Sequence, residues 1–201
     1  MKKGEVIAFI SAPGVGTSFL TKQMACRHSC PGFFEGEEGI FTPSVLSVLN
    51  SETDSAERYE WLAGRTKTML ERARAIADIG ITSYVDGDVL LMEAWLNAEI
   101  GHESPAFLKK WLQANAGSRA DKVLVLTASD EKIQENISRR GRASEQSEFI
   151  RQRALRIGRA CAELKNAYKH VEILDRTHID FTQTSSLEMV DDMIMRIPSL
   201  R

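Results

Sequence analysis

The chain of 201 residues fits one domain, and a composition of 43% hydrophobic and 27% charged residues excludes a globally disordered chain. A formal net charge of −2 argues against a protein that coats nucleic acid, and no apolar run approaches the roughly 20 residues of a membrane span. The 3 cysteines, an odd number without a disulfide framework, favour a reducing, cytoplasmic setting. We therefore expect a single domain over residues 1–201.

Strands and helices are expected to alternate along the chain. The predicted strands are Glu5–Ile10, Gly32–Glu35, Thr82–Asp86, Asp121–Thr127 and Val171–Leu174. The predicted helices are Ser18–Arg27, Thr42–Leu49, Ser55–Ile79, Val89–Ile100, Ser104–Asn115, Asp130–Ser138, Gln146–Tyr168 and Ser186–Ile197. This order predicts an α/β sandwich of three layers, in which helices flank a mostly parallel five-stranded sheet.

A glycine-containing turn joins the first strand to the first helix, where a phosphate-binding P-loop (G-x-x-x-x-G-K-[ST]) would lie. Two positions of that pattern are kept, Gly16 and Ser18, whereas Ser11 replaces the first glycine and Thr17 replaces the lysine. Ser18 is placed to touch a bound Mg²⁺ ion. The candidate phosphate-binding residues of the turn are Ala12, Pro13, Gly14, Val15, Gly16, Thr17 and Ser18.

The missing lysine removes a point charge near the phosphates of a nucleotide. Loss of one such partner costs on the order of 2–4 kcal/mol of transition-state stabilisation unless another group replaces it. Lys22, one helical turn after Ser18, is either a surface lysine or a substitute. The turn taken alone is equally compatible with an ordinary strand-to-helix connection.

A second cluster lies at Arg139, Arg140 and Arg142, around the hinge-like Gly141. Guanidinium groups bind phosphate oxygens through two parallel hydrogen bonds and stay charged at any relevant pH. The glycine would let the segment open and close over a site. A solvated basic helix end is the other interpretation, but the phosphate-loop-like turn upstream favours a lid.

The segment Ile137–Tyr168 resembles the lid pattern R-R-G-R-x-x-E and the following long helix of the deoxynucleoside kinase family, and Glu172–Phe181 is similar to its adenine-contacting segment. The resemblance implies a P-loop NTPase-type domain with a lid at about residues 137–148. It also implies phosphoryl transfer from Mg²⁺-bound ATP, or another nucleoside triphosphate, to a nucleoside-type hydroxyl. Relatives of this kind are usually homodimers, so a homodimer is expected.

The same resemblance implies roles for single residues. Glu35 would be the general base on the acceptor hydroxyl, with Glu37 and Glu38 as rivals, and Glu37 also counts among the substrate-binding candidates. The remaining substrate-binding candidates, around the pattern aromatic-Leu-x-x-Arg, are Trp61, Arg65 and Arg58. Arg139 would bind phosphate, and Arg140 and Arg142 would act in catalysis.

The family's third strand ends in an acid-Arg-Ser triplet, which here reads Asp86-Gly87-Asp88. Asp86 keeps the acidic residue of this triplet and would act in catalysis, but the arginine is absent at Gly87, as the lysine is at Thr17. Three functions stay open: an active kinase with an altered site, a catalytically silent nucleotide-binding relative, and a phage-type kinase that acts on a modified base in DNA. The net charge of −2 disfavours a DNA substrate.

Overall fold

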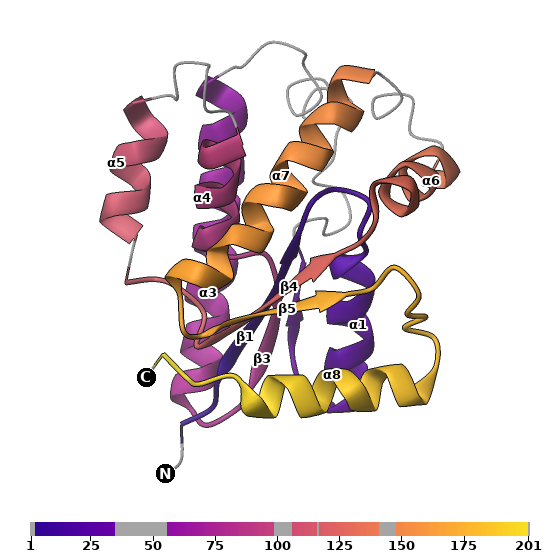
Figure 1. Ribbon diagram of the computed structural model, residues 1–201. Helices are drawn as coiled ribbons and strands as arrows, with labels where there is room; N and C mark the ends of the chain where they lie inside the picture. The colour runs from indigo at the N-terminus through magenta and orange to yellow at the C-terminus, as the bar shows by residue number, and fades with distance from the viewer. Residues whose placement is uncertain (1–2, 35–55, 99–105, 116, 141–147, 201) are drawn as a thin grey trace.

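Five strands, each parallel to its neighbours, form one sheet in the order β2–β3–β1–β4–β5. The computed structural model describes residues 3–34, 56–98, 106–115, 117–140 and 148–200 (Figure 1). The strands are β1 (Val6–Ser11), β2 (Gly32–Phe33), β3 (Ser83–Asp86), β4 (Lys122–Thr127) and β5 (Val171–Asp175). The predicted fold class is confirmed, with a described sheet that is parallel throughout rather than only mostly so.

Helices cover both faces of this sheet (Figure 1). Their bounds are α1 (Thr17–Arg27), α3 (Ala56–Asp78), α4 (Val89–Ala98), α5 (Ala106–Asn115), α6 (Asp130–Arg140), α7 (Glu148–Ala167) and α8 (Thr184–Arg196). Helices α1 and α8 lie on one side, where Arg27 and Asp191 join them through an ion pair of 2.9 Å. Helices α3, α4 and α7 lie on the other side, with α5 outside them. None of the described helices is long and apolar enough to cross a membrane.

The core lies where β1 and β4 run between the two helical layers. All six residues of β1 are buried, which explains why its sequence is a continuous apolar run rather than an alternating one. Phe9, Ile10 and Leu124 are among the largest fully buried side chains. The central strands therefore form a rigid base whose carboxyl ends carry the loops described below.

Most element boundaries agree with the sequence-based predictions to within about two residues. Among the described residues, Gly32 and Phe33 pair with β3 and Phe34 does not, while the predicted strand end Glu35 lies outside them. Gly80 follows α3 with a φ of 94°, the left-handed conformation that ends many helices. The predicted helix Thr42–Leu49 lies outside the described residues.

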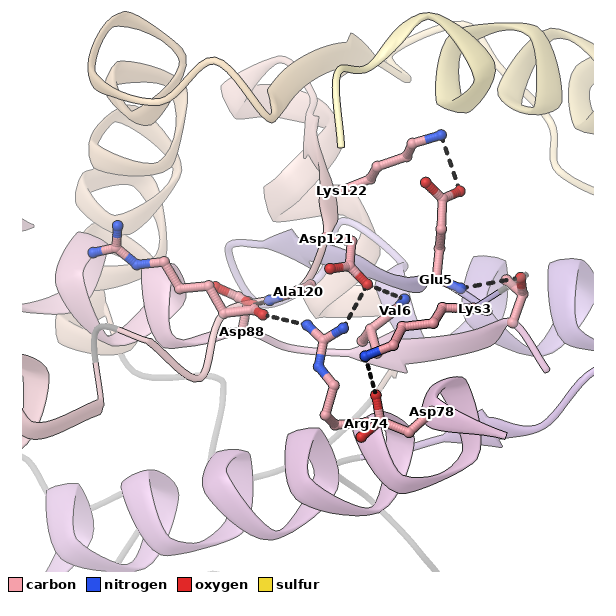
Figure 2. A network of polar contacts seen from close by, with 11 residues as sticks. Lys3, Glu5, Val6, Arg74, Asp78, Asp88, Ala120, Asp121 and Lys122 are labelled. Atoms are coloured by element: carbon pink, nitrogen blue, oxygen red, sulfur yellow. Dashed lines mark hydrogen bonds and ion pairs between the residues drawn. The ribbon is translucent and has the colours of Figure 1, made fainter. Parts of the chain in front are cut away.

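A polar network fixes the amino ends of the central strands (Figure 2). Asp121, which is 1% exposed, accepts hydrogen bonds from the backbone N–H of Val6 at 2.8 Å and from Nη1 of Arg74 at 2.6 Å. Arg74 comes from α3, so one carboxylate joins that helix to both β1 and β4. This end of the sheet is held rigidly, on the opposite edge from the loop after β1.

Candidate active site

The loop after β1 has the conformation of an anion-binding turn. Gly14 and Gly16 have φ values of 89° and 104°, a left-handed region that side chains disfavour. Gly16 is also the N-cap residue of α1, and among the described residues no side chain caps the first turn of this helix. The first backbone N–H groups of α1 therefore remain available to an anion, which the positive end of the helix dipole favours.

Helix α6 packs directly against this loop. The side-chain amide of Asn136 donates a hydrogen bond of 2.9 Å to the Gly14 carbonyl. A Cβ atom on Gly14 would lie 2.9 Å from Cγ1 of Ile137, so the contact requires glycine for space as well as for its φ. Helix α6, which leads into the predicted lid, is thus anchored on the phosphate loop. A movement of either the helix or the loop would therefore displace the other.

Ser18 and Asp86 meet at the carboxyl edge of the sheet. The Ser18 hydroxyl donates a hydrogen bond of 2.5 Å to Oδ2 of Asp86, at the end of the adjacent strand β3. Mg²⁺ prefers hard oxygen ligands and keeps several water molecules, and in P-loop enzymes a loop hydroxyl and an acidic residue hold it. The two side chains fit such an ion, and Asp86 comes from the strand on which the sequence placed it.

Gly87 and Asp88 form a turn and a cap rather than a phosphate-binding pair. Gly87 has a φ of 129°, and its N–H donates to the Phe9 carbonyl at 3.0 Å. Asp88 is completely buried and accepts hydrogen bonds from the N–H groups of Leu90 at 2.9 Å and Ala120 at 2.7 Å. An arginine at position 87 would therefore need a different backbone conformation. The absence of an arginine here thus involves the backbone as well as the side chain.

Arg176, which the sequence analysis did not single out, reaches the phosphate loop from the segment after β5. Its Nη1 donates a hydrogen bond of 2.5 Å to the Val15 carbonyl. The same nitrogen lies 2.5 Å from the place of a Cβ atom on Gly16, so a side chain there would displace the guanidinium. The only signal in the sequence was its position in the segment Glu172–Phe181, because a contact across 161 residues has no local pattern.

The structure describes the positions of some of the remaining candidate residues. Arg139 is exposed and belongs, with Arg140, to the last turn of α6, so the lid segment begins as helix. Arg65 of α3 donates a hydrogen bond of 3.1 Å to the Phe34 carbonyl, just beyond β2. It therefore lies beside the residue that leads into Glu35. Lys22 is exposed on α1.

Several predicted positions fall outside the described part of the chain. Four candidate residues belong to undescribed segments: Glu35, Glu37, Glu38 and Arg142. Arg58, Trp61 and Arg140 lie in α3 and α6, but their side chains are not described. Their proposed roles remain predictions.

Comparisons with known proteins give no family model and no curated protein that matches the sequence. Solved structures do match. A deoxyadenosine kinase from M. mycoides, solved with the products dCMP and dCDP, superposes with a TM-score of 0.69 at 13% identity, over 96% of this chain and 100% of that one. The thymidylate kinase of Candida albicans gives a TM-score of 0.66 at 12% identity, over 99% of this chain and 96% of that one.

This chain has the fold of P-loop nucleoside and nucleotide kinases. The same deoxyadenosine kinase with bound dATP superposes with a TM-score of 0.65 at 14% identity, over 95% of this chain. In a fold of this kind, ligands bind beyond the carboxyl ends of the strands. The P-loop-like turn, the Ser18–Asp86 pair and Arg176 all lie at that edge.

Proposed function

We propose that this protein is a nucleoside or nucleotide kinase, which transfers a phosphoryl group from a Mg²⁺-bound nucleoside triphosphate to a nucleoside-type hydroxyl. The observation that carries the proposal is the pairing of the Ser18 hydroxyl with Asp86 beside an uncapped helix N-terminus. It combines a site for a phosphate anion with two oxygen ligands for its cation. The shared fold supports the same reaction class.

Residue roles in this proposal follow the sequence analysis. Glu35 removes the proton of the acceptor hydroxyl, and Arg139, Arg140 and Arg142 close over the phosphates. The acceptor binds near Arg65, whose contact with the Phe34 carbonyl holds α3 against the end of β2. Because phosphoryl transfer depends mainly on positioning and charge stabilisation, these groups together with the loop N–H groups suffice for catalysis. Trp61, Arg58 and Glu37 complete the acceptor site, and the homodimer and the cytoplasmic setting remain expectations.

The test is a phosphoryl-transfer assay. The protein is incubated with Mg²⁺, each of several γ-labelled nucleoside triphosphates and a panel of deoxynucleosides and deoxynucleoside monophosphates. We expect label on at least one acceptor, dependent on Mg²⁺. No labelled acceptor with any donor, from protein that binds a nucleoside triphosphate in calorimetry, would overturn the proposal.

That last outcome would instead establish the second candidate, a catalytically silent nucleotide-binding relative. Thr17 favours this candidate, because it stands at the first position of α1 where a P-loop lysine would lie. Modified DNA can serve as one further acceptor in the same assay. Transfer to DNA, and to no free nucleoside, would identify a modified base in DNA as the acceptor.

A further inference from the structure

Arg176 is held in place along its whole length. Its backbone N–H donates to the Thr127 carbonyl at the end of β4, at 2.9 Å. Its guanidinium carbon lies 5.2 Å from the centre of the Phe181 ring, within the range of a cation–π contact. Its tip donates to the Val15 carbonyl. The side chain is thus directed at the phosphate loop before any ligand arrives.

The segment around Arg176 is braced as well. Asp175 accepts hydrogen bonds from both the N–H and the hydroxyl of Thr177, at 2.9 and 2.6 Å. That hydroxyl oxygen in turn accepts a hydrogen bond of 2.9 Å from the Ser129 N–H, which connects the turn to the start of α6. The position of Arg176 therefore follows from the ends of β4 and β5 rather than from a flexible surface loop.

The guanidinium of Arg176 forms no ion pair with the part of the chain that the structure describes. Among the described residues its only hydrogen bond from the side chain goes to a neutral carbonyl. Burial lowers the pKa of Arg176, the charge of Asp180 opposes this, and the charge of Arg139 lowers it further. An arginine nevertheless stays protonated in proteins. The positive charge of Arg176 is half-buried, and the like charge of Arg139 acts on it. An anion bound at the loop would therefore stabilise the charged guanidinium.

We propose that Arg176 binds the phosphates of the donor nucleotide and supplies the positive charge that is absent at Thr17. The inference rests on the proposed function, since it assumes a nucleoside triphosphate in the loop. The Val15 contact uses one N–H of Nη1, which leaves the other terminal N–H groups for phosphate oxygens. Gly16 makes room for the guanidinium, because any side chain at that position would collide with it.

A contact with the nucleobase is the competing role, because the segment after β5 resembles an adenine-contacting loop. The two roles differ in the ligand that detects them. Inorganic tripolyphosphate carries the phosphates without the base, whereas adenosine carries the base without the phosphates. Calorimetric titration of the full chain with Mg²⁺ and each of these probes separates the roles.

The variant for this titration is Arg176→Gln, which removes the charge and keeps a hydrogen-bond donor. We expect tripolyphosphate and ATP to bind about 100-fold more weakly, with adenosine affinity within about 2-fold of the unmodified protein. Arg196→Met, at the exposed end of α8, is the matched control and should bind both probes normally. Adding Thr17→Lys to Arg176→Gln should restore at least 10-fold of the lost affinity.

Unchanged tripolyphosphate binding in Arg176→Gln, or a loss confined to adenosine, would overturn the inference. Should that variant fail to fold, arginine modification of the unmodified protein by phenylglyoxal gives the answer. Tripolyphosphate should protect Arg176 and adenosine should not; the reverse would count against the inference. Phosphate binding is measured here without turnover, so a protein that binds tripolyphosphate through Arg176 yet transfers nothing would refute only the proposed kinase activity.

Discussion

Ser18 and Asp86 are 68 residues apart in the sequence and lie within 2.5 Å of each other in the structure. A P-loop usually supplies both a hydroxyl ligand for the metal ion and a lysine for the phosphates, and here only the first of these is kept. The loop keeps a hydroxyl that can hold the metal ion, while the lysine that would touch the phosphates is Thr17. If Arg176 supplies that charge, the anion is bound from the β5 side of the loop rather than from α1.

Replacement of Ser18 tests the metal half of this arrangement. Ser18→Ala removes one of two oxygens proposed for Mg²⁺, so we expect transfer to fall on the order of 100-fold and the Mg²⁺ concentration for half-maximal rate to rise. The measurement is the initial rate against Mg²⁺ concentration. Ser185→Ala, at an exposed position of α8, is the control and should leave both quantities unchanged. An unaltered Mg²⁺ dependence in Ser18→Ala would contradict the assignment.

Residues that belong to a local motif can be proposed from sequence, although their roles stay predictions. The spacing after an apolar strand pointed to Ser18, and the resemblance of the triplet at the end of β3 pointed to Asp86. Arg176 has no such pattern, because its role depends on a contact with Val15 that only the folded sheet creates. Asp88 could not be recognised as a structural cap either, since one of its two partners, Ala120, is 32 residues away.

At the scale of elements, the connection from β3 to α4 is constrained by its backbone conformation. Gly87 turns the chain with a φ of 129°, between the metal-site candidate Asp86 and the buried cap Asp88. A side chain there has ordinary space, since a Cβ atom would lie 3.5 Å from Cε of Met69. The constraint is therefore conformational rather than steric.

Gly87→Ala should destabilise the protein by about 1–3 kcal/mol, because alanine in this backbone conformation is strained. The measurement is the free energy of unfolding in urea. Gly117→Ala is the matched control: Gly117 is exposed, its φ is not in the left-handed range, and a Cβ atom there meets nothing within 4 Å. We expect that control to change stability by less than about 0.5 kcal/mol. Equal effects of the two substitutions would contradict the strained turn.

Elements with a strong hydrophobic pattern were the easiest to predict. Strands β1 and β4 are continuous apolar runs because helices cover both faces, and α3 shows core spacing that ends at Gly80. Strand β2 has two paired residues in the described part of the chain, and pairing length depends on the neighbouring strand rather than on the segment itself. Helix α6 extends to Arg140, two residues beyond the predicted end at Ser138, so Arg139 and Arg140 belong to this helix.

At the scale of the whole molecule, the two edges of the sheet have different tasks. The carboxyl edge carries the phosphate loop, Asp86 and Arg176. The amino edge carries the network around Asp121 and Arg74 (Figure 2). Asp88 connects these regions, since it follows the site residue Asp86 by two positions and accepts a hydrogen bond from Ala120, which precedes β4. A change in the charge of Asp88 should therefore alter the free energy of unfolding.

Burial raises the pKa of Asp88 from 3.8 to about 6, although its two backbone hydrogen bonds oppose the rise. A raised pKa means that the folded state binds the proton more tightly than the unfolded state. The stabilisation is then complete below about pH 4 and is lost as the pH rises through about 6. His170 acts in the opposite direction, because burial lowers its pKa, and its contribution is lost as the pH falls.

Asp88→Asn isolates the aspartate from these other groups, because an amide does not titrate. The amide can accept only one of the two hydrogen bonds, so the variant should be less stable at low pH. Between pH 4.5 and 7.5 the advantage of the unmodified protein should shrink by on the order of 2 kcal/mol, since each unit of pKa shift corresponds to about 1.4 kcal/mol. Urea unfolding of both proteins across this range measures the difference. Parallel stability curves would mean that Asp88 titrates alike in the folded and unfolded states, and its burial would then impose no penalty on the charged form.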